Sequence, residues 1–106
     1  MGRRADLIVV ERGVIFVVEY KLGAQQFDRT AQEQVYGYGL DLKHFHETSH
    51  KLSIVPILVA THASEVRQPS LHWDDDKLAK PICVGPDRLA AAITSISAET
   101  DGIDVE

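Results

Sequence analysis

Two apolar runs, Leu7–Val10 and Val14–Tyr20, lie so close together that they constrain the fold more than any other feature. Both runs are rich in Val and Ile, which is typical of buried β-strands. Only three residues separate them, and a two-residue turn at Arg12–Gly13 would join them as an antiparallel hairpin. We therefore expect the chain to begin with two paired, buried strands.

A helix is predicted after the hairpin. Apolar residues recur there at three- and four-residue steps and form one stripe: Phe27, Ala31, Val35, Tyr38, Leu42 and Phe45. Thr30 and Glu33 have the spacing of a capping box, although Asp28 is an alternative cap. Gly37 and Gly39 each weaken a helix by roughly 1 kcal/mol relative to Ala. Close packing of the helix against its neighbours would explain why glycine occurs at these positions.

The second half of the chain predicts two more strands and another helix. The strands are expected at Ile54–Ala60 and Ile82–Val84, with a polar loop at 61–80 between them and a helix at 85–97 after them. Pro56 indicates an edge strand or an irregularity. The order β-β-α-β-β-α predicts an α/β domain with a mixed central sheet of about four strands flanked by helices.

Length and composition narrow the possibilities further. With 106 residues, we expect one domain over 1–96 and an acidic tail or linker over 97–106. The net charge of -5 excludes a broadly basic surface, so binding of nucleic acid would need a local patch or a bound cation. The single cysteine, Cys83, excludes an intrachain disulfide. No apolar run reaches the ~18 residues of a membrane span, and no signal peptide is recognisable, so we expect a cytoplasmic protein without a membrane partner.

The second predicted strand ends in two charged residues, Glu19 and Lys21, which project from the same face. Burying such groups costs free energy unless they are paired or bind something. The ladder counted outward from the turn places Asp6 opposite Glu19, with Lys21 beside them. Like charges that face each other in a sheet are destabilising, and a divalent cation would relieve the repulsion. Two carboxylates, waters and phosphate oxygens make a typical Mg²⁺ site, and the alternative is a plain ion pair at the hairpin end.

The following helix carries Gln34 and Tyr38 one turn apart, in a Q-x-x-x-Y pattern. Asp6, then Glu19-Tyr20-Lys21 at the end of an apolar strand, then this helical pair, resembles the PD-(D/E)xK nuclease superfamily in its RecB-like branch. More closely, residues 3–63 are similar to the nuclease-like region that precedes a Schlafen-type helicase domain in a bacterial family.

The resemblance implies a restriction-endonuclease-like fold and a metal-dependent nuclease. Asp6 and Glu19 would bind Mg²⁺ or Mn²⁺, and Lys21 would be the catalytic lysine. Gln34 and Tyr38 would brace the site or touch the substrate. The implied partners are nucleic acid, with DNA favoured over RNA, and a helicase domain in the parent chain.

The roles assigned to Gln34 and Tyr38 each have an alternative. Gln32 and Tyr36 also form a Q-x-x-x-Y pattern, although Gln34 and Tyr38 fit the spacing of the family better. Tyr38 also belongs to the apolar stripe, so core packing is an equal explanation for it.

Two other functions compete with a nuclease. Members of the family usually begin with a helix that supplies another acidic residue, and this chain begins at the first strand. We therefore expect a fragment or a trimmed domain, and an inactive docking or nucleic-acid-binding module is the main alternative. The segment His46–His50, "HETSH", also matches the H-E-x-x-H pattern of zinc proteases. It lies where the helix is expected to end, which argues against that minor alternative.

Overall fold

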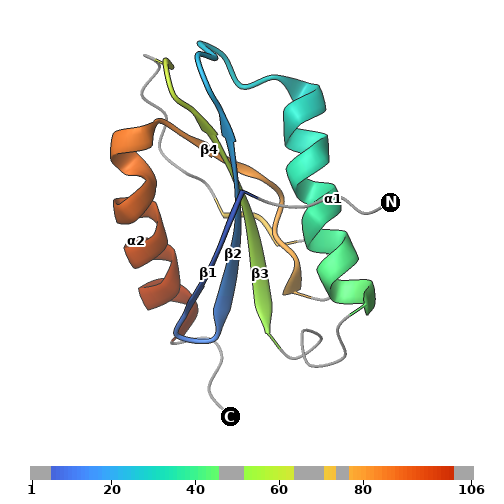
Figure 1. Cartoon of the computed structure of the whole chain (residues 1–106). Helices are drawn as coiled ribbons and strands as arrows, with labels where there is room; N and C mark the ends of the chain where they lie inside the picture. The colour runs from blue at the N-terminus through green and yellow to red at the C-terminus, as the bar shows by residue number, and fades with distance from the viewer. Residues whose placement is uncertain (1–5, 46–51, 64–70, 74–76, 102–106) are drawn as a thin grey trace.

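A four-stranded mixed sheet lies between two helices, one on each face (Figure 1). The computed structural model describes residues 6–45, 52–63, 71–73 and 77–101. The elements are β1 (Leu7–Glu11), β2 (Val14–Lys21), α1 (Arg29–Phe45), β3 (Ser53–Ala60), β4 (Ile82–Val84), a short 3₁₀ turn η3 (Pro86–Arg88) and α2 (Leu89–Asp101). The α/β class and the predicted order of elements are confirmed. Neither described helix is long and apolar enough to span a membrane.

The hairpin has the predicted register. β1 pairs antiparallel with β2, with Leu7 opposite Val18 and Glu11 opposite Val14. The turn residues Arg12 and Gly13 have φ angles of 53° and 80°. Positive φ at both central residues defines a type I′ turn, whose twist matches that of the flanking strands.

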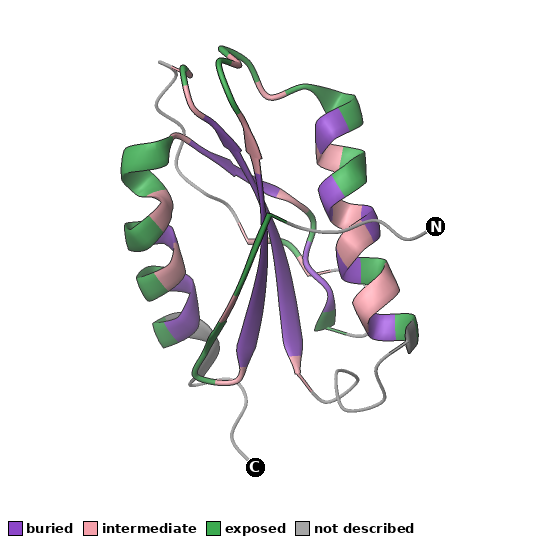
Figure 2. Ribbon diagram, in the orientation of Figure 1, coloured by how far each residue is buried: buried purple, intermediate pink, exposed green. Residues whose placement is uncertain are grey.

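β1 is exposed, so the prediction that both hairpin strands are buried is wrong for this strand. β1 lies at the edge of the sheet, and Leu7, Ile8 and Val10 are 40%, 52% and 64% exposed. Figure 2 shows the contrast with β2 and β3, which are buried along most of their length. α1 packs mainly on β3 and β2, so neither of the described helices covers β1 to a comparable extent. An apolar sequence is compatible with a buried strand, but the strand is buried only where another element packs on it.

β2, β3 and β4 run parallel to one another, so their carboxyl ends meet at one edge of the sheet. Alternation along β2 divides the core into two clusters. Ile15 and Val17 face α1, where they pack with Ala31 and Val35, whereas Phe16 and its even-numbered neighbours face α2. Glu19 and Lys21 continue the odd-numbered row and therefore lie on the α1 face.

The start of α1 is capped by Asp28. Its side-chain Oδ1 accepts a hydrogen bond of 3.1 Å from the backbone N–H of Thr30, and its carbonyl accepts the first helical bond from Gln32. Asp28 is thus the N-cap residue, and the alternative cap is the one the chain uses rather than the box formed by Thr30 and Glu33.

Pro56 lies in β3, an interior strand, so of the two predicted alternatives the edge position is wrong and the irregularity is the one that the structure has. The carbonyl of Ile54 accepts from Ala79 N–H at 2.9 Å, which shows that this side of Ile54 faces the segment before β4. By alternation, the nitrogen of Pro56 faces the same side. β3 meets that segment around Ile54 and pairs with β4 from Ile57 onward, so the missing N–H of Pro56 falls in the interruption between them.

Two other stretches of the chain differ from the predictions. The stretch at 61–80 is not polar throughout, because Leu78 and Ala79 are buried and Leu78 bridges to β3. α2 begins at Leu89, after the 3₁₀ turn, and ends at Asp101, whereas the predicted helix spans 85–97. Ile96 and Ser97 are buried, and Ile96 belongs to the core cluster on the α2 side of the sheet, so this turn is held against the sheet. The helix continues beyond it.

The type I′ turn predicts a stabilising substitution. Arg12→Asn should raise the free energy of unfolding by about 0.5–1 kcal/mol, because Asn tolerates positive φ better than Arg does. Thermal and urea unfolding measure the change. Arg88→Asn, at an exposed position without positive φ, controls for the lost charge and should change stability by less than about 0.5 kcal/mol. Equal effects of the two substitutions would contradict the backbone explanation.

Close contact between α1 and the core predicts the opposite effect at Gly39. A Cβ atom there would lie 2.8 Å from Leu78 Cδ1 and 3.4 Å from Ile54 Cγ2. Gly39→Ala should therefore destabilise the protein by about 1 kcal/mol, since overpacking outweighs the gain in helix propensity. In a Leu78→Val background, which lacks that methyl group, the same substitution should be neutral or stabilising. A loss of the same size in both backgrounds would refute the steric cause.

Candidate active site

Three of the predicted site residues meet at the carboxyl end of β2. Glu19 is only 7% exposed although it is charged. Lys21 Nζ lies 3.1 Å from Glu19 Oε2, and it donates to Gln34 Oε1 on α1 at 3.3 Å. The Lys21 side chain is 40% exposed, so its ammonium group connects a buried carboxylate with the solvent.

Asp6 is held against the backbone of the same segment. It lies in a bend just before β1, and its Oδ2 accepts a hydrogen bond of 2.8 Å from the backbone N–H of Tyr20. Its own N–H donates to the carbonyl of Val18 at 3.1 Å. Tyr20 lies between Glu19 and Lys21 in sequence, so the Asp6 carboxylate is fixed beside the E-x-K segment. Within the described part of the chain, Asp6 Oδ1 has no hydrogen-bond or ion-pair partner.

The charges of the two carboxylates are both stabilised in this arrangement. An ammonium group pairs with Glu19, and a backbone N–H supports Asp6. The ion pair considered from the sequence alone is therefore present. A buried ion pair is weak support for stability, because apolar residues of similar volume often stabilise a protein as well or better.

The loops after β2 and β3 fix the backbone that carries Lys21. The carbonyl of Lys21 accepts from the N–H groups of Ala24 and Thr61, at 3.2 and 3.3 Å. The N–H of Gly23 donates to Thr61 Oγ1 at 2.7 Å, and Gly23 adopts a φ of 77° that favours glycine. Sequence reasoning missed Thr61. Its only signal there is its position directly after an apolar strand.

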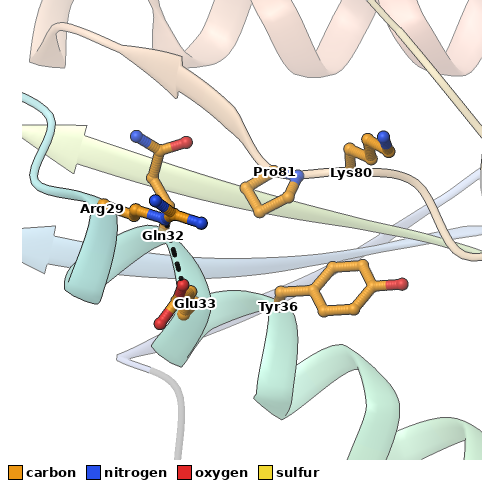
Figure 3. Close-up of a pocket in the computed structure, with 6 residues that line it drawn as sticks. All are labelled: Arg29, Gln32, Glu33, Tyr36, Lys80 and Pro81. Atoms are coloured by element: carbon orange, nitrogen blue, oxygen red, sulfur yellow. Dashed lines mark ion pairs between the residues drawn. The ribbon is translucent and has the colours of Figure 1, made fainter.

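α1 separates the two Q-x-x-x-Y pairs. Gln34 contacts Lys21, whereas Gln32 and Tyr36 line a hollow beside Lys80 and Pro81 (Figure 3). Of the two glutamines, the structure thus brings Gln34 to the E-x-K segment. Tyr38 is partly buried against the core cluster that faces α1, which matches its place in the apolar stripe.

The side chains present fit a magnesium ion better than a zinc ion. Among the residues that the structure describes, no three His, Cys, Asp or Glu side chains are grouped so that they could hold a metal. Zinc sites in proteins need three or four such ligands. Mg²⁺ is usually bound by one or two carboxylates, with waters and substrate phosphates as its other ligands, and Asp6 and Glu19 supply that number. His46–His50, the zinc-protease alternative, lies outside the described residues.

Comparisons with protein-family models, with curated proteins and with solved structures find no match to this chain. The chemical interpretation of the site therefore depends on its own residues and geometry.

The hydrogen bond from Tyr20 allows the role of Asp6 as a hydrogen-bond acceptor to be separated from its role as a negative charge. Asp6→Ala should lower the free energy of unfolding by about 1 kcal/mol, because it removes the acceptor of that N–H. Asp6→Asn keeps an oxygen at the same position and should cost much less. Urea unfolding in EDTA measures both, with Glu11→Ala as a control for loss of a negative charge next to the hairpin turn. Equal losses for Asp6→Asn and Asp6→Ala would show that the charge, and not the acceptor, matters.

Proposed function

We propose that the chain is a metal-dependent phosphodiesterase of the PD-(D/E)xK type, with a restriction-endonuclease-like fold, that cuts nucleic acid. One observation carries the proposal. Lys21 contacts both the buried Glu19 carboxylate and Gln34 of the next helix, while Asp6 accepts a hydrogen bond from the backbone of the residue between Glu19 and Lys21. These residues have the types and the chain order of the superfamily. DNA is the favoured substrate, and a helicase domain is the expected neighbour in the parent chain.

Asp6 and Glu19 would hold the cation, Mg²⁺ or Mn²⁺. A cation bound by them would supply an activated water and neutralise charge on the scissile phosphate. The supporting feature is that each carboxylate uses only one of its oxygens in its contacts with the described residues. Asp6 uses Oδ2 for Tyr20, and Glu19 uses Oε2 for Lys21, so the second oxygen of each is left for a cation.

Lys21 would act on the phosphate. An ammonium group has three N–H donors, and Glu19 and Gln34 accept two of them. The third can donate to a non-bridging phosphate oxygen, where negative charge grows as the attacking water adds. Gln34 and the loop contact through Thr61 would hold Lys21 in place for this step. Tyr38 would brace α1 against the sheet.

One observation favours the alternative, a docking or nucleic-acid-binding module without activity. The ion pair between Glu19 and Lys21 stabilises the buried carboxylate without any cation. In such a module the E-x-K segment is a strand end stabilised by an ion pair. Metal binding distinguishes the two functions, since the module has no need of it.

Cleavage and metal binding should respond differently to two substitutions. Lys21→Met should lower metal-dependent cleavage by at least about 100-fold and leave metal affinity largely intact, because Lys21 is assigned to the phosphate. Glu19→Gln should lose both, because Glu19 is assigned to the cation. The assays are calorimetric titration with Mg²⁺ and Mn²⁺ and cleavage of labelled single-stranded and duplex DNA and RNA.

Arg88→Ala, which removes an exposed cation in η3 before α2, is the matched control and should change neither property. Undiminished cleavage by Lys21→Met would remove the role assigned to that lysine. If the chain, and any longer protein that contains it, neither binds metal nor cuts any of the four substrates, the docking module is the correct function.

A further inference from the structure

The flank of α1 opposite Gln34 forms one wall of an open hollow of about 420 Å³. That volume lies within the range of small-molecule sites in proteins. We propose that this hollow binds one unstacked nucleotide of a single-stranded nucleic acid. The inference rests on the proposed function, because the nucleotide would belong to the strand that reaches Lys21. The hollow is lined by Arg29, Gln32, Glu33, Tyr36, Lys80 and Pro81.

The two walls offer apolar ring surface for a base. Figure 3 shows Gln32 and Tyr36 on α1, and Lys80 and Pro81 on the segment that leads into β4. Tyr36 also packs partly against the core cluster that faces α1, so its ring is already ordered. A base that stacks on an ordered ring loses little conformational entropy of the protein, and every base has a face that can stack.

The polar groups of the hollow suit a base edge and a phosphate. Arg29 and Glu33 form an ion pair of 3.3 Å, so their charges offset each other. The exposed Lys80 then gives the lining a net positive charge, which suits a phosphate. Gln32 Nε2 donates to the carbonyl of Phe27 at 3.1 Å, which fixes the amide and leaves its oxygen as an acceptor for a base amino group.

The hollow and the proposed active site lie on opposite flanks of the same helix. Gln34, which contacts Lys21, is two residues from both Gln32 and Tyr36, and two residues turn a helix by about 200°. A strand that crosses the first turns of α1 would therefore reach both places across roughly one helix diameter, ~10–12 Å. Duplex DNA keeps its bases stacked and would not supply a free base without flipping it out.

Binding of a short fluorescein-labelled single-stranded DNA of mixed sequence, followed by anisotropy in EDTA, tests the inference without cleavage. Tyr36→Leu keeps apolar contact with the core but removes the aromatic face, and should raise Kd by between about fivefold and a hundredfold. Tyr36→Phe should retain binding. Lys80→Ala should reduce the slope of log Kd against log salt concentration by about 0.7, as expected for one phosphate contact. Arg88→Ala is the control, and thermal melting verifies that each variant is folded.

The inference is overturned if the chain binds no single strand, if Tyr36→Leu and Lys80→Ala bind like the parent, or if duplex DNA of the same sequence binds as tightly. Failure of the proposed function is a separate result. Absence of metal-dependent cleavage together with weakened binding by Tyr36→Leu supports the nucleotide site in a module without activity. Normal binding by Tyr36→Leu together with loss of cleavage in Lys21→Met overturns the nucleotide site and leaves the nuclease in place.

Discussion

The parallel pairing of β2 with β3 holds together both the core and the candidate site. The two strands pair along their whole length, from Val14 beside Ser53 to Lys21 beside Ala60. One face of this pair supports α1 and the other supports α2. The last pair also brings the loop that contains Thr61 to the carbonyl of Lys21. Any change that shifted this register by one residue would send Glu19 to the opposite face of the sheet.

α1 joins the parts that act together in the proposed chemistry. Its buried stripe seats it on the sheet, and Gly39 brings its backbone close to Leu78 and Ile54. Because the helix is seated closely, Gln34 reaches Lys21 from one flank and Tyr36 lines the hollow from the other. The same helix thus links the strand-end charges to the segment before β4.

The sequence predicts the hairpin and the position of its charges well, because a two-residue turn and a period of two leave a single register. Glu19 and Lys21 share a face for the same reason. The helical period admits Gln32 as well as Gln34, and the preference for Gln34 comes from the family resemblance. Burial is less predictable, since β1 has the apolar composition of a core strand and lies at an edge.

Contacts between distant segments are also beyond local patterns. Pro56 is tolerated in an interior strand because of an interruption in a segment more than twenty residues away. The contact of Thr61 with Gly23 likewise depends on two strands that meet only in the folded chain. Asp28 and Thr30 are only two residues apart and both are residue types that cap helices. Propensity therefore does not decide which of them is the N-cap residue.

The exposure of β1 gives the two carboxylates of the site unequal local stability. Amide hydrogen exchange typically finds that a short, solvent-exposed edge strand opens far more often than strands buried on both faces. Glu19 belongs to the buried β2, whereas Asp6 is attached to the start of β1. Each local opening of β1 would release Asp6 while the pair of Glu19 and Lys21 stays in place. A cation that bridges both carboxylates would oppose that opening, so the edge strand would be the part of the fold whose exchange rate reports on occupancy of the site.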